Sequence, residues 1–288
     1  LLTKHADHIR VETMEFGISA ALWKMAQKIK LIDIIDKHTN KTRDQGLSIG
    51  EYIVIAAINR CTKPTSKARL SKWFKNDWLS TQFTIDPKSL TSQAFWNHFQ
   101  YFNKDIIKNI EVTINKTVLE MFQLDLDTLF YDPTNFYTFS KNENSDSLLQ
   151  FGHSKEGRKG NKLVSYSLLC ARESGVPLMH ETYPGNENDA KRFKQAPLEI
   201  TERLSALGHD PQTVTLVFDK GNHSKDAFSA IDRAGFGFIV SIRNSTQKDL
   251  LHVPKENFIQ ITLPSSKKEV RYFKTTRKLY GIERDAYI

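Results

Sequence analysis

The chain has 288 residues, of which 39% are hydrophobic and 11% aromatic, which is too much apolar surface for a disordered chain and enough for one large domain or two ordinary ones. No apolar run approaches the ~18 residues of a membrane span, and the two cysteines, Cys61 and Cys170, form neither a disulfide framework nor a metal-ligand spacing, so we expect a protein of the reducing cytoplasm. The net charge of +8 favours an anionic partner, nucleic acid first.

The first 125 residues carry the spacing of apolar residues that is typical of helices. Apolar residues from Phe16 to Ile29 recur with a period of about 3.6 residues, and a short helical pattern follows. Ser48, with Glu51 three positions later, predicts a capping box at the start of a helix that Pro64 ends. Further helices are expected over Ser66–Phe74, Ser92–Phe102 and Ile106–Phe122.

The pattern changes to a mixture of strands and helices near residue 125. The segments KLVSYSLLCA and VPLMHETYPG, separated by a turn at Glu173–Gly175, predict a hairpin. A helix is then expected over Asn186–Leu207, capped by Asn188 or Asp189, and is followed by a strand in TVTLVFD. A helix over Ser224–Ala234, a strand in FGFIVSI and short β-like runs complete the chain. This order predicts an α/β (α+β) fold after an all-helical region.

Charge is distributed unevenly along the chain. Residues 1–125 carry 18 Lys and Arg against 13 Asp and Glu, residues 126–240 carry 13 against 15, and residues 241–288 carry 10 against 5. The middle stretch is therefore the least basic. Because a metal site recruits carboxylates, this distribution suits a central metal site with flanking segments that hold a polyanion.

A basic segment with interleaved aromatic residues extends from Arg60 to Trp78. It contains no acidic residue before Asp77, and its cations are spaced so that several share one face of a helix. We expect DNA contacts from Arg60, Lys63, Lys67 and Lys72. The alternative is a solvated basic face over a core of Leu70, Trp73, Phe74 and Trp78.

Two aspartates each follow a run of β-favouring residues: Asp132 in LFYDPTNFYTF and Asp219 in TLVFDKGNHS. A strand that stops at a carboxylate, with a turn after it, holds that carboxylate rigidly toward solvent. Hard divalent cations take such oxygen ligands, and the pair suggests metal-assisted chemistry on phosphates. The alternative is that each aspartate only caps the turn or helix after it.

The words around these aspartates carry a resemblance to a known family. The succession LFYDPTNFYTF, FGHSKEGRKGNKLVSYSLLCARESGVPLMHETYPGNENDAKRF and LVFDKGNHSKDAFSAIDRAGFGFIVSIR resembles the core of insertion-sequence transposases of the DDE superfamily, over roughly residues 127–243. The resemblance implies an RNase H-like mixed sheet core in residues 126–288 and a helical, DNA-binding region in residues 1–125. It also implies Asp132 and Asp219 as catalytic metal ligands, Mg²⁺ (or Mn²⁺) as cofactor, and cleavage and transfer of double-stranded DNA at transposon ends.

The third acid of the family pattern is absent from its expected context. The family places a Glu on a late helix, within Tyr, two residues, Arg, three residues, Glu, six residues, Lys; here Tyr280 is followed at the Arg offset by Glu283. We therefore expect a C-terminally truncated chain, inactive alone, in which residues 244–288 belong to a β-rich insertion. The alternatives are an inactive DNA-binding protein derived from a transposase and an RNase H-like nuclease without strand transfer.

Further DNA contacts are expected around the two aspartates. Lys155 and Arg158 lie in a glycine-containing basic turn, and Lys220 and Asn222 follow Asp219 directly. Basic groups on a turn beside the site suit phosphate contacts, and the alternative for the turn with Lys155 and Arg158 is a solvated hairpin loop. Lys220 and Asn222 are expected within reach of a scissile phosphate. By resemblance, the protein acts as a homodimer or higher multimer on DNA. The expected location is the cytoplasm, in association with the nucleoid, with no membrane contact.

Overall fold

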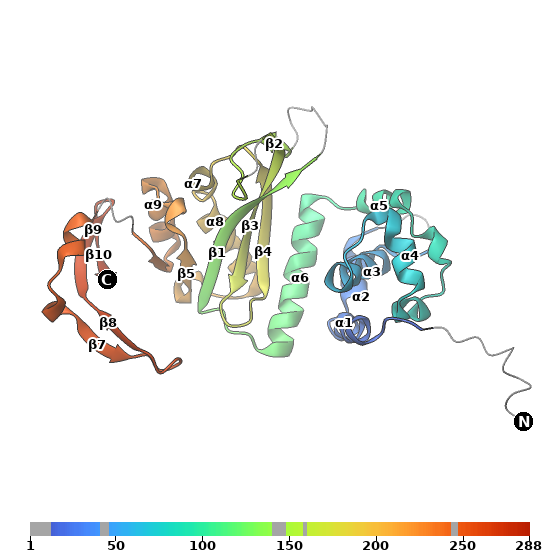
Figure 1. Cartoon of the computed structure of the whole chain (residues 1–288), viewed down its shortest axis with the longest axis horizontal. Helices are drawn as coiled ribbons and strands as arrows, with labels where there is room; N and C mark the ends of the chain where they lie inside the picture. The colour runs from blue at the N-terminus through green and yellow to red at the C-terminus, as the bar shows by residue number, and fades with distance from the viewer. Residues whose placement is uncertain (1–12, 41–45, 140–147, 158–159, 243–246) are drawn as a thin grey trace, which may run out of the picture. The chain divides into compact units, whose positions relative to one another are not determined.

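The computed structural model describes residues 13–40, 46–139, 148–157, 160–242 and 247–288. The chain divides into two compact units, Leu1–Gln123 and Leu124–Ile288. Figure 1 shows helices throughout the first unit and a mixed sheet with helices in the second. Each unit has its own buried residues, so each is described by itself.

The first unit is built from short helices. Ser48 begins α3 with the capping box that its sequence predicts: the Ser48 hydroxyl accepts from the Glu51 amide at 3.0 Å, and the Glu51 carboxylate accepts from the Ser48 amide at 2.7 Å. No described helix is long and apolar enough to cross a bilayer. The α-helices are α1 (Gly17–Lys28), α2 (Leu31–His38), α3 (Ile49–Thr62), α4 (Leu70–Lys75), α5 (Ser92–Phe99) and α6 (Lys104–Phe122). The short 3-10 helices are η2 (Lys67–Arg69), η3 (Trp78–Gln82) and η4 (Pro87–Ser89).

The core of the first unit forms around α3. Its apolar residues pack into two clusters, one with α1, α4 and the 3-10 segments, the other with α2 and α6. The largest fully buried side chains include Tyr52, Ile55 and Phe74. Asp77, 1% exposed, is paired: its carboxylate accepts from the Ser19 hydroxyl at 2.7 Å and the Leu79 amide at 2.9 Å.

The second unit contains a six-stranded mixed sheet in its described residues. The order is β2-β3-β1-β5-β6, with β4 paired to β3; β1, β3 and β4 run antiparallel to their neighbours, and β1, β5 and β6 run parallel. An antiparallel meander extended on one side by two parallel strands is the expected RNase H-like arrangement. The strands are β1 (Thr128–Thr138), β2 (Gln150–Phe151), β3 (Lys162–Ala171), β4 (Pro177–Pro184), β5 (Thr215–Phe218) and β6 (Gly237–Val240).

One face of this sheet is buried under helices, because residues alternate between its two sides. Leu129 and Tyr131 of β1 and Phe218 of β5 are buried, and Phe193 lies 5.1 Å from the Tyr131 ring and 4.7 Å from the Phe218 ring, between centroids. Phe130, on the opposite side of β1, is 43% exposed. The helices of this unit are α7 (Asp189–Arg192), α8 (Ala196–Leu207), η5 (Pro211–Thr213), η6 (Lys220–Asn222) and α9 (Lys225–Ala234).

Two antiparallel hairpins follow the sheet. β7 (Ile259–Thr262) pairs with β8 (Glu269–Tyr272), and β9 (Lys274–Leu279) pairs with β10 (Ile282–Tyr287), after η8 (Lys248–His252) and η9 (Lys255–Asn257). Arg284 fastens the second hairpin to the sheet region. Its guanidinium binds both Asp232 oxygens at 2.7 and 2.9 Å and lies 4.8 Å from the centre of the Phe238 ring.

Three departures from the predicted elements concern the sheet and its helices. β1 does not stop at Asp132 but continues to Thr138, because each residue to Thr138 keeps a partner in β3. The helix expected over Asn186–Leu207 is divided into α7 and α8; Pro197, which has no N–H, lies in the first turn of α8. The two-residue strand β2 was not predicted.

Candidate active site on the central strands

Pairing of β1 with β5 brings Asp132 next to the end of β5, which Asp219 follows directly. The last paired residues of these parallel strands are Tyr131 and Phe218. Asp132 and Asp219 each follow directly, so the two aspartates occupy corresponding positions on adjacent strands although they are 87 positions apart in the sequence. Neighbouring strands lie about 4.8 Å apart. The fold therefore brings the two predicted carboxylates to one edge of the paired region.

Both aspartates follow directly on buried strand residues. Asp132 lies on the side of β1 opposite the buried Leu129 and Tyr131, and Asp219 follows the buried Phe218 at the end of β5. Both residues are exposed. Two exposed carboxylates are hard oxygen donors of the kind that Mg²⁺ and Mn²⁺ take.

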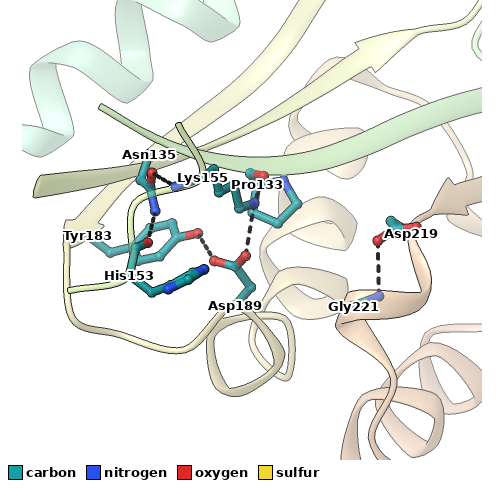
Figure 2. Close-up of polar contacts among 8 residues, drawn as sticks. All are labelled: Pro133, Asn135, His153, Lys155, Tyr183, Asp189, Asp219 and Gly221. Atoms are coloured by element: carbon teal, nitrogen blue, oxygen red, sulfur yellow. Dashed lines mark hydrogen bonds and ion pairs between the residues drawn. The ribbon is translucent and has the colours of Figure 1, made fainter. Parts of the chain in front are cut away.

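Asp219 also caps the turn that follows it, which is the role expected of this residue if it does not bind a metal. Its Oδ2 accepts a hydrogen bond from the Gly221 amide at 3.1 Å and so begins η6. Figure 2 shows this bond. The contact engages one carboxylate oxygen. Among the described residues no group of three His, Cys, Asp or Glu could hold a metal ion, so the pair has no third acidic partner there.

The turn that contains Lys155 is bound to β1 immediately beyond Asp132. The side chain of Asn135 spans this turn: its Nδ2 donates to the His153 carbonyl at 2.9 Å and its Oδ1 accepts from the Lys155 amide at 3.1 Å. The Lys155 ammonium donates to the Pro133 carbonyl and pairs with Asp189 Oδ2 at 3.0 Å. Figure 2 shows Asn135 bonded to His153 and Lys155, and the Lys155 side chain bonded to Pro133 and Asp189.

Asp189 connects the Lys155 turn to Tyr183, a buried residue of β4. Its Oδ1 accepts from the Tyr183 hydroxyl at 3.1 Å. Burial raises the pKa of Tyr183, and the charge of Asp189 raises it further, so this hydroxyl stays a donor.

The nearby Arg192 side chain is bound by the Glu199 carboxylate. Burial alone would lower the pKa of Arg192, yet the hydrogen bonds and charge of Glu199 raise it above its usual value.

Two glycines bring the turn and the end of β4 into backbone contact. A Cβ on Gly152 would lie 2.2 Å from the Gly185 carbonyl oxygen, and a Cβ on Gly185 would lie 2.2 Å from the Leu163 carbonyl oxygen. No side chain fits at these distances. Gly152 and Gly185 therefore allow β3, the end of β4 and the Lys155 turn to pack closely.

The predicted DNA contacts have different surroundings. Arg60, Lys63 and Lys72 are exposed, while Lys67 is partly buried against aromatic rings. On the opposite side of this basic segment, Leu70, Trp73 and Phe74 are buried, as expected if the segment is a solvated basic face over an apolar core.

Near the aspartates, Lys220 is exposed, whereas the Asn222 side chain is 1% exposed and lies beneath the surface. Arg158 lies outside the described residues. Lys155 is already paired with Asp189, so a phosphate contact by its ammonium would compete with that carboxylate.

Asp189 and Asn135 were not predicted as parts of this network. The sequence predicts Asn188 or Asp189 as a helix cap; Asp189 is the first residue of α7, and its carboxylate binds Tyr183 and Lys155. The sequence pattern that could have indicated the Tyr183–Asp189 contact is YPGNEND, in which a tyrosine and an aspartate flank a glycine turn. Because side-chain contacts between distant words depend on the fold, spacing alone does not reveal them.

Comparisons with known proteins give structural neighbours but no sequence family. No protein-family model and no curated protein matches the chain. The chain is similar to the Mos1 transposase paired-end complex with the left transposon end, at 11% identity and a TM-score of 0.28, with 69% of this chain and 61% of that chain covered. It is also similar to the Mos1 mariner paired-end complex with Mn, at 13% identity and a TM-score of 0.30, with 74% and 68% covered. The chain thus spans 61% of the length of the first neighbour, and at such identities and TM-scores the likeness carries no functional argument.

Proposed function

We propose that the chain is part of a DDE transposase that cuts and joins DNA at the ends of an insertion sequence. The observation that carries this proposal is the β1–β5 register, which supports an exposed carboxylate pair made by Asp132 and Asp219. The family resemblance around both aspartates supplies the reaction class. Asp132 and Asp219 would hold Mg²⁺ or Mn²⁺, and the chemistry that such an ion supplies when bound is activation of an attacking oxygen and stabilisation of a leaving oxygen at phosphorus.

The remaining residues bind and orient the DNA in this proposal. The helical region, residues 1–125, contacts the duplex through Arg60, Lys63, Lys67 and Lys72. Beside the carboxylates, Lys220 contacts the backbone near the scissile phosphate, together with Lys155 and Arg158. The core of residues 126–288 holds the carboxylates on adjacent strands, so that their spacing is set by backbone hydrogen bonds rather than by mobile side chains. We infer that the protein acts as at least a dimer on DNA.

A second candidate is a DNA-binding protein without catalysis. The observation that favours it is the lack of a third acid beside the pair among the described residues. Two carboxylates bind a divalent ion less tightly than three, since ligand charge sets affinity. In this candidate the basic helical region would still bind DNA, and loss of the carboxylates would have no consequence for activity.

Cleavage assays on the purified full-length protein provide the test. We expect it to nick transposon-end DNA in Mg²⁺ or Mn²⁺, and we expect Asp132→Asn or Asp219→Asn to reduce cleavage at least ~100-fold while end binding changes less than about threefold. Asp226→Asn, an exposed aspartate on α9, is the matched control. Cleavage retained in either site variant excludes the metal assignment.

Transfer is tested separately from cleavage. A labelled, precleaved end should become covalently joined to target DNA by the wild-type protein. Cleavage without joining identifies the RNase H-like nuclease alternative. Binding with neither reaction identifies the non-catalytic candidate.

A further inference from the structure

An exposed aromatic pair lies on the surface of the helical unit. Trp96 is 58% exposed and Phe99 is 39% exposed, and both belong to α5. Their spacing of three residues places them on the same face of the helix. Large aromatic side chains are normally buried, so two on one exposed helix face indicate a binding surface.

The core holds these rings rigidly. Phe95 stacks on Phe99 with 4.3 Å between ring centroids, and it lies 5.7 Å from the ring of Tyr52, which is 1% exposed. The Tyr52 hydroxyl donates to the carbonyl of Thr91, the residue that caps α5. The exposed rings are therefore mounted on a fixed helix, and little ordering entropy is lost when a ligand stacks on them.

Positive charge adjoins the aromatic pair. The Lys67 ammonium lies 4.2 Å from the Trp96 ring centre and 4.8 Å from that of Phe95. Arg69 of the same short helix is exposed. The sequence has no acidic residue between Arg60 and Asp77, and Asp77 is buried; α5 contains none either. The surface thus joins a largely exposed indole to a cation that makes no ion pair with the described residues, which suits an anionic aromatic ligand.

We propose that Trp96, Phe99 and Lys67 bind an unpaired DNA nucleotide, with its base stacked on Trp96 and its phosphate held by Lys67. A paired base inside a duplex offers only its edges to a protein, whereas an unpaired base offers its flat face, which an exposed indole matches. The cation beside the ring provides the backbone contact. This inference deepens the proposed function, and rests on it for DNA as the partner, since strand cleavage leaves unpaired nucleotides at a DNA end.

Binding of one labelled oligonucleotide, as a single strand and as a blunt duplex, tests this site by fluorescence anisotropy on the full chain. We expect Trp96→Leu to weaken single-strand binding about tenfold and duplex binding less than about twofold. Trp96→Phe should restore most single-strand affinity because it restores a π-face. Lys67→Gln should reduce the salt slope on single strands by about 0.7.

Phe16→Leu is the matched control, because Phe16 is 57% exposed in the same unit and its ring packs on Trp78. It should leave both affinities unchanged. An equal loss on both DNA forms after Trp96→Leu, or no loss on either, overturns the proposal. So does a Trp96→Leu variant whose oligomeric state changes by light scattering, which would identify the surface as an interface between copies.

The outcome is separable from that of the proposed function. Single-strand binding that depends on Trp96, in a protein that does not cleave DNA, supports the stacking site and rejects the transposase. Cleavage that depends on Asp132 and Asp219, with single-strand binding indifferent to Trp96, supports the transposase and rejects the stacking site.

Discussion

Lys155 is held by two oxygens from different elements, the Pro133 carbonyl on β1 and the Asp189 carboxylate on α7. Each of these elements also adjoins one candidate carboxylate. Pro133 directly follows Asp132, and α7 packs against η6, which begins at Asp219. A single ammonium therefore links the surroundings of both aspartates.

Replacement of Asp189 should loosen this turn without unfolding the protein. The Lys155 and Asp189 side chains are 41% and 30% exposed, so we expect Asp189→Asn to lower the free energy of unfolding by less than about 1 kcal/mol. Hydrogen exchange at the Lys155 amide should nevertheless accelerate about fivefold or more, because the turn then opens locally. Asp226→Asn, which removes the Lys194–Asp226 ion pair at 2.6 Å, is the control and should leave that amide unchanged.

Two buried tyrosines beneath the sheet should make stability fall at high pH. Burial raises the pKa of Tyr131 from 10.0 to about 12, and the pKa of Tyr183 is raised as well. The unfolded chain loses these protons first, so the stabilisation is fully present below about pH 10 and is lost as the pH rises through about 12. The urea midpoint should fall across this window, and less steeply in Tyr131→Phe. An identical slope in the variant would contradict the burial of this hydroxyl.

At the scale of elements, the site depends on how tightly segments approach one another. The Lys155 turn and the end of β4 touch through the backbone of Gly152 and Gly185. The short element β2 pairs with β3 beside this contact. The three segments around Asp132, Gly152 and Gly185 thereby pack against one another.

A methyl group at Gly185 should disrupt this layer. Its Cβ would lie 2.2 Å from the Leu163 carbonyl oxygen, which is backbone and cannot rotate away. We expect Gly185→Ala to lower the free energy of unfolding by about 1–3 kcal/mol or more, measured by urea denaturation. Gly17→Ala meets nothing within 4 Å and should change it by less than about 0.5 kcal/mol. Equal effects of the two substitutions would contradict the close approach.

The elements themselves were largely predictable, whereas their contacts were not. The capping box at Ser48, the hairpin of β3 and β4 and the C-caps Gly208 and Gly235 follow from local chemistry that a short segment contains. The extension of β1 beyond Asp132 could not be predicted locally, because it depends on partners in β3. The Lys155–Asp189 pair likewise joins side chains 34 positions apart.

At the scale of the whole molecule, the net charge of +8 is concentrated away from the stretch that contains the carboxylates. Residues 1–125 hold five more cations than anions, and residues 126–240 hold two fewer. A polyanion is attracted mainly to residues 1–125 and 241–288, which each hold five more cations than anions, while the carboxylates repel it unless their charge is compensated. Binding affinity and cleavage should therefore respond to different parts of the chain.

The salt dependence of DNA binding should report the basic segment. Each lost phosphate contact lowers the slope of log K against log salt by about 0.9 on duplex DNA. We expect the combined variant Lys63→Gln, Lys67→Gln and Lys72→Gln to bind duplex DNA more weakly with a smaller slope. The combined variant Lys24→Gln, Lys88→Gln and Lys104→Gln changes three exposed lysines elsewhere in the unit and is the control for net charge. Equal slopes in the two variants would identify the segment as a solvated face.

The parallel pairing of β1 with β5 also has a consequence for the order of synthesis. β1, β3 and β4 are all complete by Pro184, and β3 pairs with both β1 and β4, whereas β5 is made only after α8. A chain emerging from the ribosome can therefore complete its meander while Asp132 still lacks its neighbour. The carboxylate pair can form only when β5 pairs with β1, so a nascent chain carries no complete pair before Asp219 has been translated.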